Sequence, residues 1–385
     1  MGDTGKPQVV VVGGGIGGLA TALALQRQGC RARVLERSGL LGPHGAGLVL
    51  SPSAQRCLGE LGIAQQVRAR ATVLARSVVR RPSGRELVRV DLGGRGSLLG
   101  ILRADLVEVL ASSLDPGVVE LGHSVGDVAD LDADVVVGAD GLRSTVRAAM
   151  GHDTHPQHRG YTVWRALAPP GSGVDLVADG VPTLSETWGR GLRLGSVPVA
   201  RGSAYVYACV SDGRAVHGLD DLRRLFAGWH GPVPELLAAM EPGTVLRHEI
   251  LDLRPGATPL HHGRLVLVGD AAHAMEPNLG QGAGLALEDA VVLARSLSHA
   301  TASASSVEAA LSRYARARGP RVTSLGRQSR RIGRVAQHAH PAVVGVRDLS
   351  MLAVPSALAR RAAARASTWR PPAAPVPTPL HEEIR

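Results

Sequence analysis

The chain has 385 residues, of which 44% are hydrophobic, so it is long enough for one large globular unit or two closely packed domains. Its formal charge of +10 comes from arginines spread along the chain and one lysine, Lys6, and with only four Trp, four Tyr and one Phe to stack on bases we expect no nucleic-acid partner. No apolar run reaches the roughly 18 residues of a membrane span, no signal peptide opens the chain, and three scattered cysteines favour neither a disulfide framework nor a metal site, which together predict a cytoplasmic protein without a metal.

The chain opens with a predicted strand, a glycine-rich turn, a helix and a second strand. Residues 8–12 form an almost continuous β-branched run, which is typical of a strand buried on both faces. Apolar residues at helical spacing predict a helix over 16–28, ended by Gly29. Residues 32–35 predict the next parallel strand, with Glu36 at its end. This order predicts the start of a Rossmann-like α/β domain.

The turn between the first strand and the first helix has the G-x-G-x-x-G pattern. Because glycine has no Cβ, such a turn is tight and lets a pyrophosphate approach the backbone amides at the helix N-terminus. Glu36 has the spacing of a carboxylate that accepts hydrogen bonds from a ribose. The pattern alone does not separate FAD from NAD. The predicted dinucleotide contacts here are Gly13, Gly15, Ile16, Gly18, Glu36 and Arg37.

Two later segments each place a carboxylate directly after a buried strand, beyond helices predicted at 53–61 and 104–114. Residues 134–147, DVVVGADGLRSTVR, predict a strand, then Asp140, then a helix. Residues 264–290, RLVLVGDAAHAMEPNLGQGAGLALEDA, predict a strand, Asp270, a Pro/Gly loop and another helix. A carboxylate at the carboxyl end of a strand is placed to bind ribityl or ribose hydroxyls.

The loop over 277–284 presents backbone amides at the start of a helix predicted for 285–297. Such an N-terminus stabilises negative charge, as on the N1/C2=O edge of a reduced flavin. We expect His273 to pack and hydrogen-bond against this loop rather than to act as a base, and His261 and His262 to form a turn. The predicted cofactor contacts of the loop are Gly280, Gly282, Ala283 and Gly284.

Between these segments the hydrophobic period falls toward two. From about residue 161 to 210, runs such as 192–199 and 203–210 lie between Pro and Gly turns, which predicts an antiparallel sheet inserted into the first domain. Alternation turns only about half of its side chains inward. The candidates for a substrate pocket in this sheet are Trp164, Trp188, Arg193, Tyr205 and Tyr207.

The GGGIGG turn with Glu36, the GADGLRSTVR segment and the GDAAHAMEPNLGQGAGLALEDA segment together resemble the class A, single-component FAD-dependent monooxygenases, the aromatic hydroxylases with the fold of p-hydroxybenzoate hydroxylase. The resemblance covers about residues 8–335. It implies FAD as the cofactor and NAD(P)H as a transient co-substrate. It also implies FAD and NAD(P)H binding for Asp140, contact with the ribityl chain for Asp270, a place beside the pyrophosphate for Arg103, and a place on the reactive side of the flavin for Pro277.

The predicted fold class is therefore α/β, with a discontinuous architecture. A Rossmann-like FAD-binding domain is expected over 1–76, 97–156 and 252–300, interrupted by an antiparallel β-sheet substrate domain over 77–96 and 157–251. C-terminal helices are expected over 301–369, followed by a flexible Pro-rich tail over 370–385.

The resemblance implies a monooxygenase that consumes NAD(P)H and dioxygen. A flavin C4a-hydroperoxide would hydroxylate an aromatic or other electron-rich small molecule. Epoxidation, Baeyer–Villiger insertion or a reductase reaction on the same fold are the alternatives, and a non-catalytic FAD-binding protein is a further one. An arginine-rich, lysine-poor composition is associated with GC-rich bacterial genomes, where such enzymes often act in secondary metabolism. The sequence does not choose the substrate, NADH or NADPH, or the oligomeric state.

Overall fold

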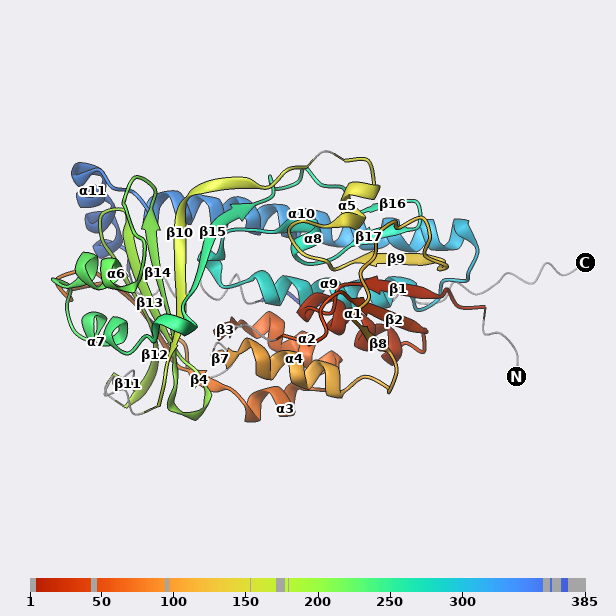
Figure 1. Cartoon of the computed structure of the whole chain (residues 1–385), viewed down its shortest axis with the longest axis horizontal. Helices are drawn as coiled ribbons and strands as arrows, with labels where there is room; N and C mark the ends of the chain where they lie inside the picture. Colours follow the sequence, from red (N-terminus) through yellow and green to blue (C-terminus); the bar gives the residue numbers. More distant parts are fainter. Residues whose placement is uncertain are drawn as a thin grey trace, which may run out of the picture.

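A computed structural model describes residues 5–42, 47–93, 97–152, 154–170, 177–178, 180–355, 361 and 368–372. Figure 1 shows two layered parts along the long axis: a mostly parallel sheet with its helices, and a tall, mostly antiparallel sheet at the other end. The long helix α10 (Ala304–Ala336) runs along both parts. None of the described helices is both long enough and apolar enough to cross a membrane.

The first sheet has the strand order β16-β17-β9-β1-β2-β8. β1 pairs in parallel with β2 and β9, and β9 pairs in parallel with β17. The four residues of β1 and the four of β9 are all buried, as expected for valine-rich strands covered on both faces. The bounds are β16 (His261–His262), β17 (Leu265–Leu267), β9 (Val135–Gly138), β1 (Val9–Val12), β2 (Ala32–Glu36) and β8 (Val119–Leu121).

Helices α1 (Ile16–Arg27) and α9 (Gly282–Leu297) pack against each other beside this sheet. The predicted end of α1 is confirmed, because Gly29 follows it with a φ of +69°, a left-handed conformation that suits glycine. Helices also form where 53–61 and 104–114 predict them, as α2 (Pro52–Glu60) and α4 (Arg103–Ser112). The other elements of this part are α3 (Ala64–Ala69), α5 (Thr145–Ala149), α8 (Asp270–His273) and a small sheet of β3 (Gly47–Leu50), β7 (Leu98–Leu102) and β4 (Thr72–Leu74).

The second sheet has the order β15-β10-β14-β13-β12-β5-β6, with β11 paired to β12. The antiparallel pairing of β10, β14, β13 and β12 confirms the sheet predicted for 161–210. Helices α6 (Leu219–Phe226) and α7 (Val233–Ala238) cover one of its faces. The bounds are β15 (Leu246–Asp252), β10 (Gln157–Ala168), β14 (Ala204–Ser211), β13 (Leu192–Pro198), β12 (Val181–Trp188), β5 (Arg76–Arg80), β6 (Glu86–Asp91) and β11 (Val177–Ala178).

The turn expected at His261 and His262 is wrong, because these residues form β16 and pair antiparallel with β17. The neighbouring strand supplies the hydrogen bonds, which a two-residue polar segment does not reveal by its own pattern. Within the C-terminal region expected to be helical, α10 is followed by α11 (Pro341–Leu352). The expected tail over 370–385 lies outside the described residues beyond 372, and the division into domains remains our proposal.

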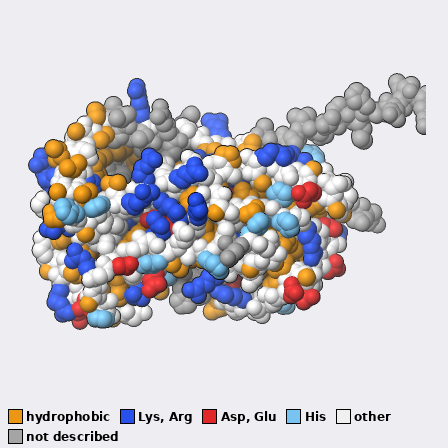
Figure 2. Space-filling view, turned by 90° about the horizontal axis from the view of Figure 1, so that it is seen from above, with side chains coloured by type: hydrophobic (Ala, Val, Ile, Leu, Met, Phe, Trp, Pro, Cys, Tyr) orange, Lys and Arg blue, Asp and Glu red, His pale blue; other side chains and the backbone are white. Residues whose placement is uncertain are grey.

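Several arginines of the C-terminal helices are exposed along α10. Its solvent-facing arginines include Arg327, Arg331 and Arg334. Figure 2 shows Lys and Arg side chains grouped near the middle of the face seen from above.

Candidate active site

The predicted cofactor residues meet at one edge of the first sheet. Strands β1, β2, β9 and β17 run in parallel, so their carboxyl ends lie together. Gly13, Glu36, Asp140 and Asp270 each stand at or just beyond one of these ends. In open parallel sheets this edge is where ligands bind. The tertiary structure therefore gathers residues that lie more than 250 positions apart in the chain.

The glycine turn has the geometry of a dinucleotide cradle. Gly13 has a φ of +108°, and a Cβ there would lie 2.5 Å from the Ala139 carbonyl oxygen. A Cβ on Gly18 would lie 1.9 Å from the Gly13 oxygen, so only glycine allows this close packing of turn and helix. A Cβ on Gly15 would instead meet nothing within 4 Å, and no side chain caps α1, which begins at Ile16. The uncapped amides face open space where a pyrophosphate fits.

The three carboxylates at this edge have different partners. The Gly14 amide donates to Glu36 Oε2 at 2.6 Å, and the Ser38 amide donates to Oε1 at 2.8 Å, which fixes the carboxylate beside the turn. Asp140 Oδ2 accepts from the Thr145 amide at 2.7 Å, whereas its Oδ1 is buried without a partner among the described residues. Asp270 is exposed. Buried polar atoms normally have partners, so the free Asp140 oxygen points to a missing ligand.

Two predicted arginine contacts lie beside this edge. Arg103 begins α4 and is half-buried, and Arg37 follows β2 and is exposed. Their roles beside the cofactor remain predictions.

The loop between α8 and α9 forms the opposite wall of the site. Pro277 is exposed and begins the short 3-10 helix η4 (Pro277–Leu279), and Gly280 ends η4 with a φ of +61°. The α9 helix begins at Gly282 without a side-chain cap, and a Cβ there would meet nothing within 4 Å. Ala283 and Gly284 follow in its first turn. The loop thus offers an uncapped helix N-terminus, as predicted for a site that stabilises negative charge.

His273 is part of the support beneath this loop. Its Nε2 lies 2.6 Å from Oδ2 of the buried Asp289, which also accepts from the Gly269 amide at 2.9 Å. Burial alone would raise the pKa of Asp289, but the charges of His273 and Arg318 and these hydrogen bonds lower it to about 2. His273 therefore has a buried, ionised partner, in keeping with the packing role expected for it.

These features fit FAD. The glycine turn and the uncapped α1 would hold the pyrophosphate, Glu36 would hold the adenosine ribose, and the α9 N-terminus would face the flavin. The unpartnered Asp140 oxygen and the space that Cβ atoms would fill at Gly15 and Gly282 are the observations that support this fit.

The sheet face turned toward the loop carries four of the five predicted pocket residues. Tyr205, Tyr207, Arg193 and Trp188 lie on it. Tyr205 packs closely against the start of β3, because a Cβ on Gly47 would lie 2.5 Å from the Cβ of Tyr205. Arg193 is 1% exposed and its Nη2 donates to Asn278 Oδ1 in the loop at 2.7 Å. Its Nε and Nη1 are buried and have no acceptor among the described residues.

The two tyrosines are protonated donors at neutral pH. Burial is the main cause that raises the pKa of Tyr205, to about 12. Burial and the nearby Glu186 also raise the pKa of Tyr207, and its hydroxyl donates to the Glu186 carboxylate. The Tyr207 proton is thus used by Glu186, and Tyr205 can present its hydroxyl as a hydrogen-bond donor.

The two tryptophan candidates lie on opposite faces of the sheet. Trp164 alternates to the opposite face and packs among α6 and α7 with Phe226 and Leu237. Trp188 lies on the same face as Arg193, at the end of β12, where its Nε1 donates to Glu186 Oε2 at 2.8 Å. Its ring is 5.7 Å from the Arg347 guanidinium of α11. Trp164 is thus removed from our pocket candidates, because β10 turns it away from the loop.

Four residues near Arg193 were not predicted from the sequence. Asn278 and Glu276 flank Pro277 in the sequence. Their position next to a predicted site residue could therefore have indicated that they belong to the site. Tyr161 and Glu186 lie in strands, where only the pairing register decides which face they share. Hydrogen bonds join Tyr161, Glu276 and Asn278, and the link between Tyr161 and Asn278 spans 117 residues of the chain.

Comparison with known proteins agrees with this geometry. The FAD binding domain family model matches residues 6–99 and 108–329. The aurachin C monooxygenase/isomerase of Stigmatella aurantiaca is 34% identical, over 89% of this chain and 93% of that protein. The 2-heptyl-3-hydroxy-4(1H)-quinolone synthase of Pseudomonas aeruginosa is 32% identical, over 92% of this chain and 96% of that protein. The Klebsiella pneumoniae protein HpxO, crystallised with FAD and uric acid, superposes with a TM-score of 0.82 at 26% identity, covering 93% of this chain and 96% of that one.

The fold and the site define a flavoprotein with a Rossmann-like FAD domain and a β-sheet roof. The chain belongs to the FAD binding domain family of class A monooxygenases, and it is an FAD-dependent monooxygenase. The predicted cofactor and class of enzyme are confirmed, and the alternative of a non-catalytic FAD-binding protein is set aside.

Proposed function

We propose that this monooxygenase hydroxylates an aromatic or N-heteroaromatic ring that carries an oxygen substituent, with NAD(P)H as electron donor and dioxygen as oxidant. The observation that carries the proposal is Arg193, buried on the sheet face beside the loop, with two donor nitrogens, Nε and Nη1, that lack acceptors among the described residues. A buried guanidinium is costly unless its donors are satisfied. A carbonyl, phenolate or carboxylate oxygen of a substrate would satisfy them.

This arrangement would also activate the ring. FAD, once reduced by NAD(P)H, would supply the chemistry that moves one oxygen atom from dioxygen to the substrate. Arg193 would stabilise negative charge on the substrate oxygen, and electron density released from that oxygen makes the ring a better nucleophile. Tyr205 and Tyr207 would help to exclude water and orient the ring.

The names of the related proteins support this substrate class. The product in the name of the Pseudomonas enzyme is a hydroxylated quinolone with a ring carbonyl, and uric acid, bound to HpxO, is an oxygen-rich heterocycle. Both compounds carry an oxygen that could accept hydrogen bonds from the unpartnered nitrogens of Arg193. NAD(P)H would bind transiently in a groove, since the described α/β part has one glycine-rich dinucleotide turn.

The test is oxidation of NADH and of NADPH by the purified, FAD-loaded enzyme in the presence of 4(1H)-quinolone, urate and hydroxybenzoates. We expect at least one of these to accelerate oxidation and to gain one oxygen atom from isotopically labelled dioxygen. Nuclear magnetic resonance of the product separates ring hydroxylation from epoxidation and from Baeyer–Villiger insertion. Faster oxidation without label in any product would indicate a reductase and overturn the proposal.

A variant tests the role of Arg193. Arg193→Met should retain FAD but weaken binding of the accelerating compound at least tenfold, about 1.4 kcal/mol. Arg331→Met, on the exposed face of α10, is the matched control and should behave as the wild type.

A further inference from the structure

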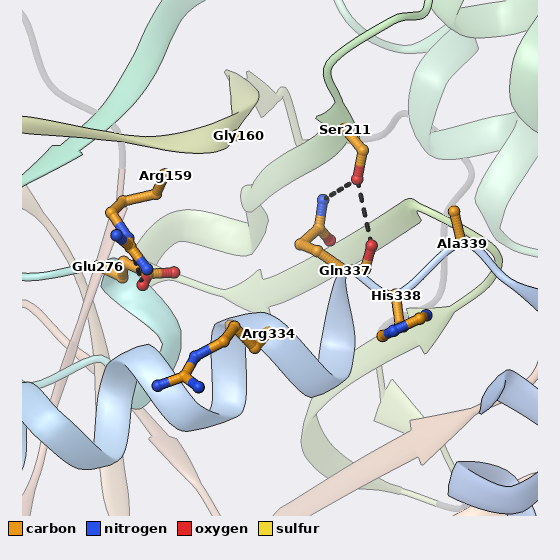
Figure 3. Close-up of a pocket in the computed structure, with 9 residues that line it drawn as sticks. Arg159, Gly160, Ser211, Glu276, Arg334, Gln337, His338 and Ala339 are labelled. Carbon is orange, nitrogen blue, oxygen red and sulfur yellow. Dashed lines mark hydrogen bonds and ion pairs between the residues drawn. The ribbon is translucent and has the colours of Figure 1, made fainter.

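A chain of hydrogen bonds links Arg193 to a pocket on the outside of the molecule. Figure 3 shows this pocket, of about 290 Å³, between the ends of β10 and β14 and the C-terminal part of α10. Arg159 and Glu276 point toward each other at one side of it. The Arg159 Nε donates to Glu276 Oε1 at 3.1 Å, although Glu276 is only 2% exposed. The negative charge of Glu276 is thus balanced from the pocket side.

The other oxygen of Glu276 faces the interior. Its Oε2 accepts from the Tyr161 hydroxyl at 3.1 Å and from Asn278 Nδ2 at 3.0 Å. The α10 helix leaves room for this carboxylate, because a Cβ on Gly333 would lie 2.1 Å from Oε2. Glu276 is therefore a buried carboxylate with three hydrogen-bond donors, and the absence of a side chain at Gly333 makes room for it. Such a carboxylate is part of the packed interior and not an incidental surface contact.

The carboxylate determines the orientation of the Asn278 amide. Asn278 Nδ2 donates to Glu276 Oε2 and to the Ser329 carbonyl at 3.1 Å, so both amide protons are used. The Asn278 oxygen must then face Arg193, from which it accepts at 2.7 Å. A flipped amide would set an N–H group against a guanidinium that has only donors. Glu276 therefore holds Arg193 through one intervening amide.

This link leaves the charge of Arg193 available. Among the described residues, no carboxylate lies within ion-pair distance of Arg193, whose recorded partners are Asn278 Oδ1 and Cys209 Sγ at 3.4 Å. A direct Asp or Glu partner would neutralise the guanidinium. A neutral amide fixes its position through a hydrogen bond and leaves the positive charge for a ligand.

We propose that Glu276 and Asn278 are positioning residues that aim Arg193 and keep its charge free, so that the enzyme selects substrates with an acceptor oxygen. They act through Arg193 and do not touch the substrate. The inference rests on the proposed function, because it deepens the role of the same site.

The test compares binding of two matched probes to the FAD-loaded enzyme, 4(1H)-quinolone and quinoline, which lacks the ring oxygen. Dissociation constants come from changes in the flavin absorbance, so turnover is not needed. Glu276→Gln removes the charge but keeps the shape, and Asn278→Asp adds a carboxylate beside Arg193. Both should weaken binding of the quinolone at least fivefold and change binding of quinoline less than twofold.

Two controls separate this link from a general effect on folding. Glu249→Gln, on the exposed side of β15, should bind both probes as the wild type does. In a double-mutant cycle, Glu276→Gln should add no further loss to Arg193→Met, because its effect passes through the arginine. FAD content and circular dichroism check that each variant is folded.

The outcomes distinguish the two ideas. If Arg193→Met weakens quinolone binding but Glu276→Gln and Asn278→Asp do not, the positioning role is wrong and the proposed function stands. If Arg193→Met leaves quinolone binding unchanged, or if the wild type prefers quinoline, the proposed substrate contact fails and the inference fails with it. Failure of the wild type to bind either probe also counts against both.

Discussion

Asp289 and His273 meet beneath the loop that follows the first sheet, with His273 Nε2 2.6 Å from Asp289 Oδ2. Asp289 Oδ1 accepts from Arg318 Nε at 2.7 Å, and both side chains of this second pair are completely buried. Its neighbour Glu288 accepts from Arg318 Nη1 at 2.8 Å and from Arg321. One buried ionic network thus links α8, α9 and α10 directly beneath the loop between α8 and α9.

Acid should weaken this network. The folded pKa of Asp289, about 2, lies below its ordinary value of 3.8, so the carboxylate stabilises the fold fully above about pH 4 and loses this effect as the pH falls toward 2. The contribution is on the order of 2 kcal/mol. Asp289→Asn should lower the free energy of unfolding by about 3–5 kcal/mol at neutral pH, since Arg318 loses a buried partner. Urea unfolding from pH 7 to pH 3 measures both effects.

The variant should also lose part of the acid dependence, which a simple packing defect would not change. Asp220→Asn, on the exposed side of α6, is the control. An equal slope of stability against pH in wild type and Asp289→Asn would rule out the assigned role of this carboxylate.

Gly15→Ala should weaken FAD binding without unfolding the protein. Gly15 has an extended backbone, with φ −76° and ψ −177°, and a Cβ there meets nothing within 4 Å in the protein. The methyl group would instead occupy the space in which we place the pyrophosphate. We expect at least a tenfold rise in the FAD dissociation constant, about 1.4 kcal/mol, by titration of flavin fluorescence. Gly59→Ala is the control and should bind FAD normally. A Cβ at this exposed position in α2 also meets nothing within 4 Å.

Asp270→Ala should separate cofactor binding from stability. The side chain is exposed at the start of α8, so its removal should change the melting temperature of the FAD-free protein by no more than a few degrees. If it holds the ribityl chain, the affinity for FAD should fall about tenfold. Unchanged affinity would remove Asp270 from the cofactor site.

Trp369 should stabilise the fold from near the end of the described chain. Its ring lies 5.0 Å from the guanidinium carbons of both Arg318 and Arg321, and its carbonyl accepts from Arg56 Nε at 3.1 Å. Trp369→Ala should lower the free energy of unfolding by about 1–2 kcal/mol. Trp369→Phe should recover part of that loss because a ring remains. Equal stability of Trp369→Ala and the wild type in urea would contradict this role.

The sequence by itself determined the local elements and the cofactor edge. Four consecutive valines, a glycine turn and a helix stripe dictate β1 and α1, and a carboxylate just after each strand end follows from short spacings. Since parallel strands share one carboxyl edge, Glu36, Asp140 and Asp270 could be assigned to one site before their positions were known.

Only the tertiary structure decided which side chains of the second sheet face the loop between α8 and α9. Period-two alternation gives a strand two faces but does not say which face meets another domain, so Trp164 was predicted inward and lies outward. The pairing of β13 with β14 and the approach of the loop bring Arg193 and Asn278 together across 85 residues. Glu276 acquires its place only because α10, from the far end of the chain, closes over it at Gly333. Such contacts depend on how whole elements pack, which no local pattern in the sequence encodes.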